Sequence, residues 1–184
     1  MRGCNVALAV VGAIWSASAL SSPVLLSPDW ATQACQVWNT DPVLTQKLVE
    51  SKWVSNDKGR GYKVVQIYRG DCEHSDWVEL RIAQQDNKAQ CIYGGARKTA
   101  TPDSSIDYVM HADTGRWVEM GHGDYGPMKA MALGRLQFSG PMWEAMNNMA
   151  PFENFLLLVG KVPADTSACP ADPHAAVLPG LGGH

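Results

Sequence analysis

The sequence predicts a single α+β domain in which helices cover one face of a mostly antiparallel sheet of about five strands. Three observations support this prediction. Helix start signals occur early in the chain, short segments with alternating apolar residues occupy its middle, and a long apolar stripe with helical spacing follows them. The composition, with 46% hydrophobic and 18% charged residues, is ordinary for one soluble globular domain.

Residues 1–19 have the layout of a secretory signal peptide. A positive start at Met1 and Arg2 precedes an apolar run over residues 6–15, and Ala17-Ser18-Ala19 forms a small-residue cleavage site. The apolar run is too short for a permanent membrane anchor. We therefore expect a periplasmic or secreted protein without a stable membrane anchor. The alternative is that these residues form a buried first helix of the mature domain.

The net charge and the cysteines narrow the classes of protein to which the chain could belong. The formal net charge is −3 and no stripe of lysine and arginine is present, so nucleic acid is not an expected partner. Four cysteines follow the signal: Cys35, Cys72, Cys91 and Cys169. An even number in an exported protein favours two disulfides, with three possible connectivities. Because Cys72 and Cys91 flank an expected hairpin, we favour that bridge, which leaves Cys35 with Cys169.

Two helices are expected before the sheet. The first begins around Pro28. In the second, Asp41 is the expected N-cap and Pro42 the first helical residue, and the helix continues to about Lys52. A turn cluster over residues 56–61 then separates the helices from the strands.

Short segments with period-two alternation predict the strands, over residues 62–68, 77–83, 88–93 and 105–112. In the second segment Val78, Leu80 and Ile82 share one face, and the intervening Glu79 and Arg81 take the other. In the last segment, the residues on one side are Ile106, Tyr108, Met110 and Ala112. This pattern predicts a sheet with one packed face and one wetter face.

The remaining chain is mostly helical in pattern. A helix is expected from Asp113 through Met120, a second over residues 127–133, a strand over 135–138, and a long apolar helix from 140 to 162. One stripe of that helix comprises Met142, Ala145, Met146, Met149, Phe152, Leu156 and Val159. Pro151 should break or kink the helix after Met149. Residues 163–184 form a Pro-, Gly- and Ala-rich tail in which little regular structure is expected.

The methionines are unevenly placed. Apart from Met1, all of them lie between Met110 and Met149. Methionine is flexible and polarisable, so it suits a surface that must fit variable apolar shapes. The alternative is that these side chains simply fill a core.

Residues 127–140, PMKAMALGRLQFSG, together with the amphipathic helix after them, resemble the C-terminal half of sterol carrier protein 2 (SCP2) domains. The family pattern A-x-x-x-G-x-L-x-F/I-x-G is matched by Ala130, Gly134, Leu136, Phe138 and Gly140. Gly134 suits a left-handed residue after a helix, and Gly140 suits a tight turn. The resemblance spans roughly residues 41–162 and is specific from about 106 onward. It implies an SCP2-like domain over residues 20–162.

This resemblance implies an apolar cavity that binds and carries a lipid, such as a sterol, a hopanoid-like molecule or a fatty acyl chain, without a cofactor or chemical conversion. The signal and the cysteines point to an exported bacterial member. The expected lining residues are Met110, Trp117, Met120, Met131, Leu133, Phe138, Met142, Met146, Met149, Phe152, Phe155 and Leu156.

Other function classes have weaker support. Neither His111, His122 and Asp124 nor the Cys72-Glu73-His74 cluster has a recognised metal-ligand spacing, so no metal site is expected. No nucleophile elbow, P-loop or dinucleotide fingerprint is present, and we expect no enzyme activity. The main alternative is an exported accessory protein whose apolar groove binds a protein partner, since a groove and a lipid pocket use the same residue types.

Overall fold

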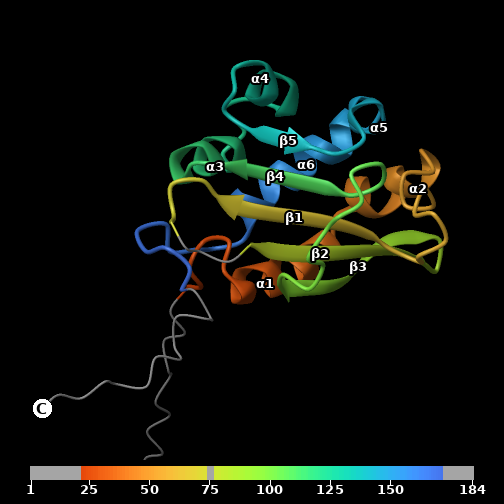
Figure 1. The fold of residues 1–184 in the computed structure, drawn as a ribbon, viewed down its shortest axis with the longest axis horizontal. Helices are drawn as coiled ribbons and strands as arrows, with labels where there is room; N and C mark the ends of the chain where they lie inside the picture. Colours follow the sequence, from red (N-terminus) through yellow and green to blue (C-terminus); the bar gives the residue numbers. More distant parts are fainter. Residues whose placement is uncertain (1–21, 74–76, 172–184) are drawn as a thin grey trace, which may run out of the picture.

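A five-stranded mixed sheet forms the centre of the molecule, described from a computed structural model over residues 22–73 and 77–171 (Figure 1). The spatial order is β3 (Lys88–Ala96), β2 (Val78–Gln85), β1 (Lys63–Arg69), β4 (Tyr108–Ala112) and β5 (Gln137–Ser139). Only the β1–β4 pair is parallel. The predicted fold class is therefore confirmed. The expected signal over residues 1–19 and residues 172–184 of the expected tail lie outside the described residues.

Helices cover one face of this sheet. The elements are α1 (Pro28–Trp38), the π-helical turn η1 (Val43–Lys47), α2 (Leu48–Glu50), α3 (Thr114–Gly121), α4 (Pro127–Ala132), α5 (Met142–Met146) and α6 (Met149–Lys161). In Figure 1, α1 and α6 lie behind the sheet, whereas α4 and α5 lie beyond the edge formed by β5. None of the helices in the described ranges is long and apolar enough to cross a membrane.

Both early helices begin where the sequence predicts. Ser27 accepts a hydrogen bond from the Trp30 backbone N–H at 3.2 Å, just before Pro28. The Asp41 carboxylate accepts from the backbone N–H groups of Val43 and Leu44 at 2.9 and 3.2 Å. These bonds satisfy amide groups that have no partner inside the helix.

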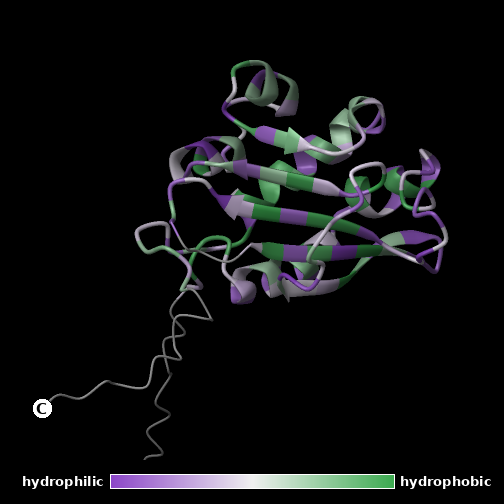
Figure 2. Cartoon of the chain, viewed as in Figure 1, coloured by the Kyte–Doolittle hydropathy of each residue, from purple (hydrophilic) through white to green (hydrophobic). Residues whose placement is uncertain are grey.

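The inner face of the sheet is apolar, and the alternation along β1 and β2 is visible as green and purple bands in Figure 2. Val65, Leu80 and Met110 are buried in the same core. However, β4 begins at Tyr108 and not at residue 105, because the backbone N–H groups of Ile106 and Asp107 donate to the Asp103 carbonyl and form a turn there.

The outer face is polar but locally buried. Glu79 on β2 and Gln66 on β1 are fully buried, although the alternation predicts a wetter face. The Glu79 carboxylate accepts from the Thr99 backbone N–H at 2.7 Å and from the Arg81 guanidinium at 2.7 Å. The chain after β3 therefore covers this part of the sheet.

The predicted single long helix is two helices. It breaks at Asn147 and Asn148, and not after Met149 as expected from Pro151. Pro151 is the third residue of α6, where the missing N–H has no intrahelical partner to lose. The expected stripe is therefore split, and Met142 and Met146 do not share a helix face with Phe152.

The favoured disulfide pairing is wrong. The bridges are Cys35–Cys91, which joins α1 to β3, and Cys72–Cys169, which joins the end of β1 to the C-terminal segment. Their Cα atoms are 5.3 and 5.6 Å apart. Cys91 pairs across the sheet with Ile82, four residues along β2 from Val78. Cys72 follows the end of β1, which pairs with Val78 at the start of β2. Four residues of strand separate Val78 from Ile82, about 13 Å, so Cys91 is too far from Cys72 for a bridge.

Backbone hydrogen bonds and a disulfide anchor the segment after α6. The backbone N–H of Leu25 donates to the Asp165 carbonyl at 2.8 Å, and the Asp165 N–H donates to the Pro23 carbonyl at 2.8 Å. Cys169 adds its bridge four residues later. Within residues 163–171 the structure has no helix or strand beyond the isolated bridge of Asp165 with Val24.

Candidate functional site

An apolar cavity of about 40 Å³ lies between the sheet and the helices. It is bounded by β1 and β4 on one side and by α1, α2, α5 and α6 on the others. Its lining residues are Trp38, Leu48, Trp53, Val65, Tyr108, Met110, Ala145, Asn148, Pro151, Phe152 and Phe155. Because almost all of these side chains are apolar, the cavity suits an apolar molecule.

The strands and α6 position the centre of this lining. Val65 on β1 pairs in register with Tyr108 on the parallel neighbour β4, so both side chains face the helices. Phe152 and Phe155 project from α6 onto this surface, and the Phe155 ring packs edge-on against Trp38 with the centroids 6.2 Å apart. Aromatic side chains thus form the cavity walls from both layers.

The structure brings three of the twelve expected lining residues to the cavity: Met110, Phe152 and Phe155. Trp117, Met120 and Leu156 are buried elsewhere in the core, and Met131, Phe138 and Met149 are partly buried against it. The last three, Leu133, Met142 and Met146, are exposed. The methionine cluster is therefore divided between the core and the surface.

Sequence reasoning missed most of the wall. Val65 could have been found, because it is two positions from the core residue Ile67 and so shares its face. Tyr108 was expected on the face of Met110 but was not assigned to the site. Trp38 is the last residue of α1 and Trp53 follows α2. Both enter the wall only through tertiary packing, which has no local sequence signal.

A cluster of polar groups around Glu144 of α5 lies next to the cavity and includes the lining residues Trp53 and Tyr108. The Tyr108 hydroxyl donates to Glu144 Oε1 at 2.6 Å and accepts from Trp53 Nε1 at 2.9 Å. Lys63, fully buried on β1, forms an ion pair with the same carboxylate. Its ammonium lies 4.4 Å from the centroid of the Trp53 ring, in cation–π contact.

Burial decides the protonation behaviour of this cluster. Burial lowers the pKa of the Lys63 ammonium, and the hydrogen bond to Glu144 opposes that shift. Burial and then the Glu144 carboxylate raise the pKa of Tyr108 well above its ordinary value. The Tyr108 phenol therefore stays neutral and remains a hydrogen-bond donor at physiological pH.

Helix α5 is a wall held mainly by polar contacts. Ala145 is its one buried residue. Besides Lys63 and Tyr108, Glu144 Oε2 accepts from Asn56 Nδ2 at 2.6 Å. Asn148, just after α5, donates to the Glu144 carbonyl at 2.8 Å and accepts from the Ser51 hydroxyl at 2.6 Å. A short helix with little apolar packing opens more easily than one embedded in the core.

The histidines considered as metal ligands lie apart. The His111 ring stacks on Tyr68 with the centroids 4.6 Å apart, and His122 is exposed at the end of α3. Across residues 22–73 and 77–171, no three His, Cys, Asp or Glu side chains are grouped to hold a metal ion.

These features define a class: α+β proteins that enclose an apolar space between a five-stranded sheet and a layer of helices. The sequence matches the model of the SCP-2 sterol transfer family over residues 47–153, which is more than half of the chain. The chain therefore belongs to the SCP-2 sterol transfer family, and the resemblance noted in residues 127–140 is confirmed. The SCP2 domain is generally a non-catalytic lipid-binding fold.

Solved structures similar to the chain are distant in sequence. A crystal structure of sterol carrier protein 2 is 17% identical, with a TM-score of 0.49, and the match covers 76% of this chain and 99% of that one. A conserved hypothetical protein from Thermus thermophilus, described as a possible sterol carrier protein, is 18% identical, with a TM-score of 0.48 and coverage of 80% and 96%. No curated protein shows significant sequence similarity to the chain.

Proposed function

We propose that the protein binds a lipid with a long apolar portion in the cavity beneath α5 and α6 and carries it without chemical conversion. The observation that carries this proposal is the apolar lining by Val65, Met110, Phe152 and Phe155 in a member of the sterol transfer family.

The energetics are favourable enough for such a ligand. Burying about 16 methylene groups contributes about 13 kcal/mol. Association costs about 4–15 kcal/mol. When the association cost is near the lower end of this range, about 5 kcal/mol, the remainder of about 8 kcal/mol corresponds to a micromolar dissociation constant without any polar contact.

The cavity must expand to hold the ligand. A volume of about 40 Å³ holds only a few water molecules, whereas ligand pockets typically measure about 300–1,000 Å³. We propose that α5 moves outward, since polar contacts of Glu144 and Asn148 hold it in place more than buried apolar surface does.

The polar atoms around Glu144 give the ligand an orientation. Tyr108 and Asn148 both belong to the lining, and the Tyr108 hydroxyl and the Asn148 amide both donate hydrogen bonds to Glu144. We propose that the polar group of the lipid lies at this end and its apolar chain between β4 and α6. Sterols, hopanoid-like lipids and fatty acids all have such a polar end.

We also propose that the protein acts outside the cytoplasm, in the periplasm or secreted. Two disulfides pair all four cysteines that follow the expected signal, and disulfides persist in oxidising compartments.

The binding proposal is tested with delipidated protein and cis-parinaric acid, a fluorescent fatty acid. Ala145→Leu adds three carbons to the cavity wall and should weaken probe binding by at least about tenfold, since the space for the chain is filled. Ala150→Leu makes the same exchange at an exposed position of α6 and should bind like wild type. If wild type binds no probe, or if both variants bind as wild type does, the cavity is not the lipid site.

A further inference from the structure

A second pocket, of about 170 Å³, lies where the C-terminal ends of α3 and α6 meet. The backbones of the two helices are in direct contact there, since a Cβ atom at Gly160 would lie 2.2 Å from the Gly121 carbonyl oxygen. The remaining walls are Leu25 and residues 162–166, the segment after α6 that we call the strap. This pocket shares no lining residue with the first cavity.

The strap is held in place by three kinds of contact. Its backbone bonds to the segment before α1, and the buried Arg69 guanidinium donates to the carbonyls of Thr166 and Ala168 at 3.3 and 2.5 Å. The Cys72–Cys169 bridge follows directly. A wall that is ordered in advance lowers the entropy cost of binding a ligand.

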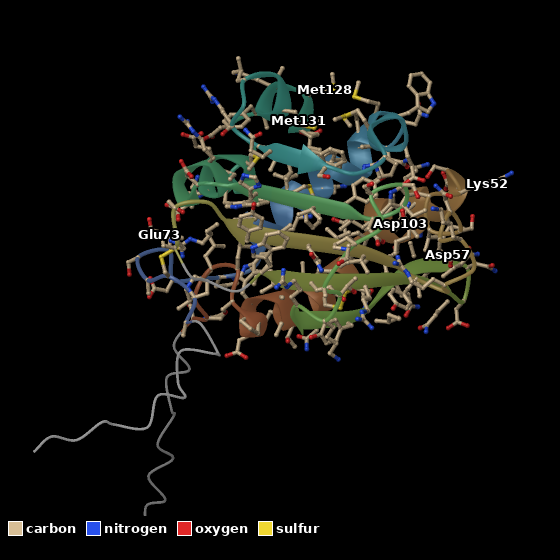
Figure 3. The ribbon with its side chains drawn as sticks, in the orientation of Figure 1. Lys52, Asp57, Glu73, Asp103, Met128 and Met131 are labelled. Carbon is tan, nitrogen blue, oxygen red and sulfur yellow. A yellow bond between two sulfur atoms is a disulfide. The ribbon has the colours of Figure 1, made fainter. Side chains whose placement is uncertain are left out.

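Figure 3 shows where the strap is anchored. Glu73, the neighbour of Cys72 in the anchoring bridge, is labelled at one end of the molecule. Lys52, the neighbour of Trp53 in the wall of the first cavity, is labelled at the opposite end. The two sites are therefore distinct in position as well as in lining.

Most of the second pocket comes from outside the part of the chain that the family model matches. Of its nine lining residues, only Val118 and His122 lie within residues 47–153. The others belong to the segment before α1, to the last turn of α6 and to the strap. Segments that flank the matched domain therefore build this pocket.

The last turn of α6 supplies free hydrogen-bond acceptors to this pocket. In a longer helix, the Val159 carbonyl would accept from residue 163, but Pro163 has no N–H. Among the described residues, no backbone N–H donates to the carbonyl of Val159 or of Gly160. A ligand that offers a hydrogen-bond donor would satisfy one of these carbonyl groups.

The other lining groups suit a molecule that is mostly apolar. Leu25, Val118 and Val162 supply aliphatic side chains, whereas His122 and Thr166 supply groups that can accept or donate a hydrogen bond. An ionised ligand group would have to lose its hydration beside the aliphatic side chains, which is costly. A neutral ligand with one donor therefore fits this lining best.

The volume limits the size of the ligand. A cavity of about 150 Å³ is large enough to bind benzene. A pocket of about 170 Å³ therefore holds one six-membered ring with a small substituent, and a long acyl chain does not fit.

We propose that the second pocket binds a small neutral molecule with an apolar ring and one hydroxyl group, the chemical class of phenol. The ring packs against Leu25, Val118 and Val162, and the hydroxyl donates to a free carbonyl at the end of α6. This site does not depend on the proposed lipid function, because it uses none of the residues of the first cavity.

The test is fluorine NMR of para-fluorophenol titrated with the full mature protein. We expect saturable binding with a dissociation constant of about 1 mM or lower. Ala164→Leu fills the pocket from the strap and should weaken binding by at least about tenfold. Ala168→Leu makes the same exchange at an exposed strap position outside the lining and should bind like wild type.

A comparison of ligands tests the chemical class. The probe para-fluorotoluene has nearly the shape of para-fluorophenol but no donor, so it should bind at least about tenfold more weakly. The acid para-fluorobenzoate should not bind measurably, because its carboxylate would have to lose its hydration. Equal affinities for the phenol and the toluene would overturn the assigned class.

Variants of the two sites should have opposite effects. Ala145→Leu should bind para-fluorophenol as wild type does and lose cis-parinaric acid, whereas Ala164→Leu should do the reverse. If Ala164→Leu does not fold, amide shifts of wild type decide, because the Gly160 amide should move on titration and the Phe152 amide should not. The proposal is overturned by a wild-type protein without saturable binding, by equal losses in Ala164→Leu and Ala168→Leu, or by shifts confined to the first cavity.

Discussion

At the scale of single residues, Glu79 is a charged group buried within the outer face of the sheet. Its carboxylate accepts hydrogen bonds from Gln66, Arg81 and Thr99. Burial alone would raise the pKa of this carboxyl, but these bonds outweigh it and hold the pKa below the ordinary value of 4.5. The folded state therefore favours the ionised form.

This residue makes stability depend on pH. Because the folded pKa is depressed, the contribution of Glu79 is present above about pH 4.5 and is lost as the pH falls through the lower folded value. Glu79→Gln should lower the free energy of unfolding at pH 7 by about 1–3 kcal/mol, since the charge-assisted hydrogen bonds to the buried carboxylate are lost and the partly exposed Arg81 loses its counter-charge. Urea denaturation from pH 7 to pH 3 measures this. The variant should lose less stability over that range than wild type does.

Glu153→Gln at an exposed position of α6 is the control and should change stability by less than about 0.5 kcal/mol. A Glu79→Gln protein as stable as wild type at pH 7 would show that the buried network does not stabilise the fold.

The alternation in residues 77–83 predicts which side chains face the helices, and Val78, Leu80 and Ile82 are indeed fully buried. It does not predict the burial of Glu79. That burial depends on Lys98 and Thr99 folding back over the sheet, a tertiary contact with no local periodicity.

At the scale of elements, an ion pair is one of the polar contacts that hold α5 against the sheet. Glu144 connects the helix to Lys63 and Tyr108 on the sheet, and the Lys63 side chain is fully buried. Glu144→Gln should lower the free energy of unfolding by about 3–5 kcal/mol, because it leaves the buried ammonium without a counter-charge. It should also increase hydrogen exchange of the α5 amides more than that of the α6 amides.

Lys63→Met combined with Glu144→Leu removes both charges and should recover most of that stability. Glu50→Gln, in an exposed pair with Lys47, is the surface control and should cost about 0.5 kcal/mol or less. Equal effects of Glu50→Gln and Glu144→Gln would contradict the assigned role of the ion pair.

Element boundaries show where sequence reasoning fails. Apolar spacing predicts one helical stretch over residues 140–162 and does not detect the break at Asn147 and Asn148. Pro151 is the stronger breaking signal, but it lies in the first turn of α6, where it is tolerated. The break separates the exposed Met142 and Met146 from the buried Phe152, so part of the expected lining lies on the surface.

At the scale of the whole molecule, Cys35–Cys91 and Cys72–Cys169 close loops with sequence separations of 56 and 97 residues. Long loops give large stabilisation in the chain-entropy description, about 4 kcal/mol each. Cys72→Ser with Cys169→Ser should therefore lower the melting temperature markedly, and peptide mapping should recover the two remaining cysteines as one bridge. A map that links Cys72 to Cys91 in wild type would contradict this topology.

The α+β class, the mostly antiparallel sheet and the family follow from residues 62–140, because alternation and the 127–140 motif are local signals. The disulfide connectivity cannot be predicted from such local signals. It depends on how α1 packs on β3, which places Cys35 beside Cys91. The cavity wall combines residues from Trp38 to Phe155. Sequence patterns could therefore predict only the wall residues on the strands and on α6.

The central claim is that this cavity carries lipid, and native mass spectrometry of the protein from its producing cells tests it most directly. We expect a polypeptide that begins at Leu20, is four hydrogens lighter than its reduced mass, and carries a lipid that Ala145→Leu removes and Ala150→Leu retains. A folded wild-type protein that shows only the mass of the polypeptide, and from which solvent extracts no lipid, would contradict the claim.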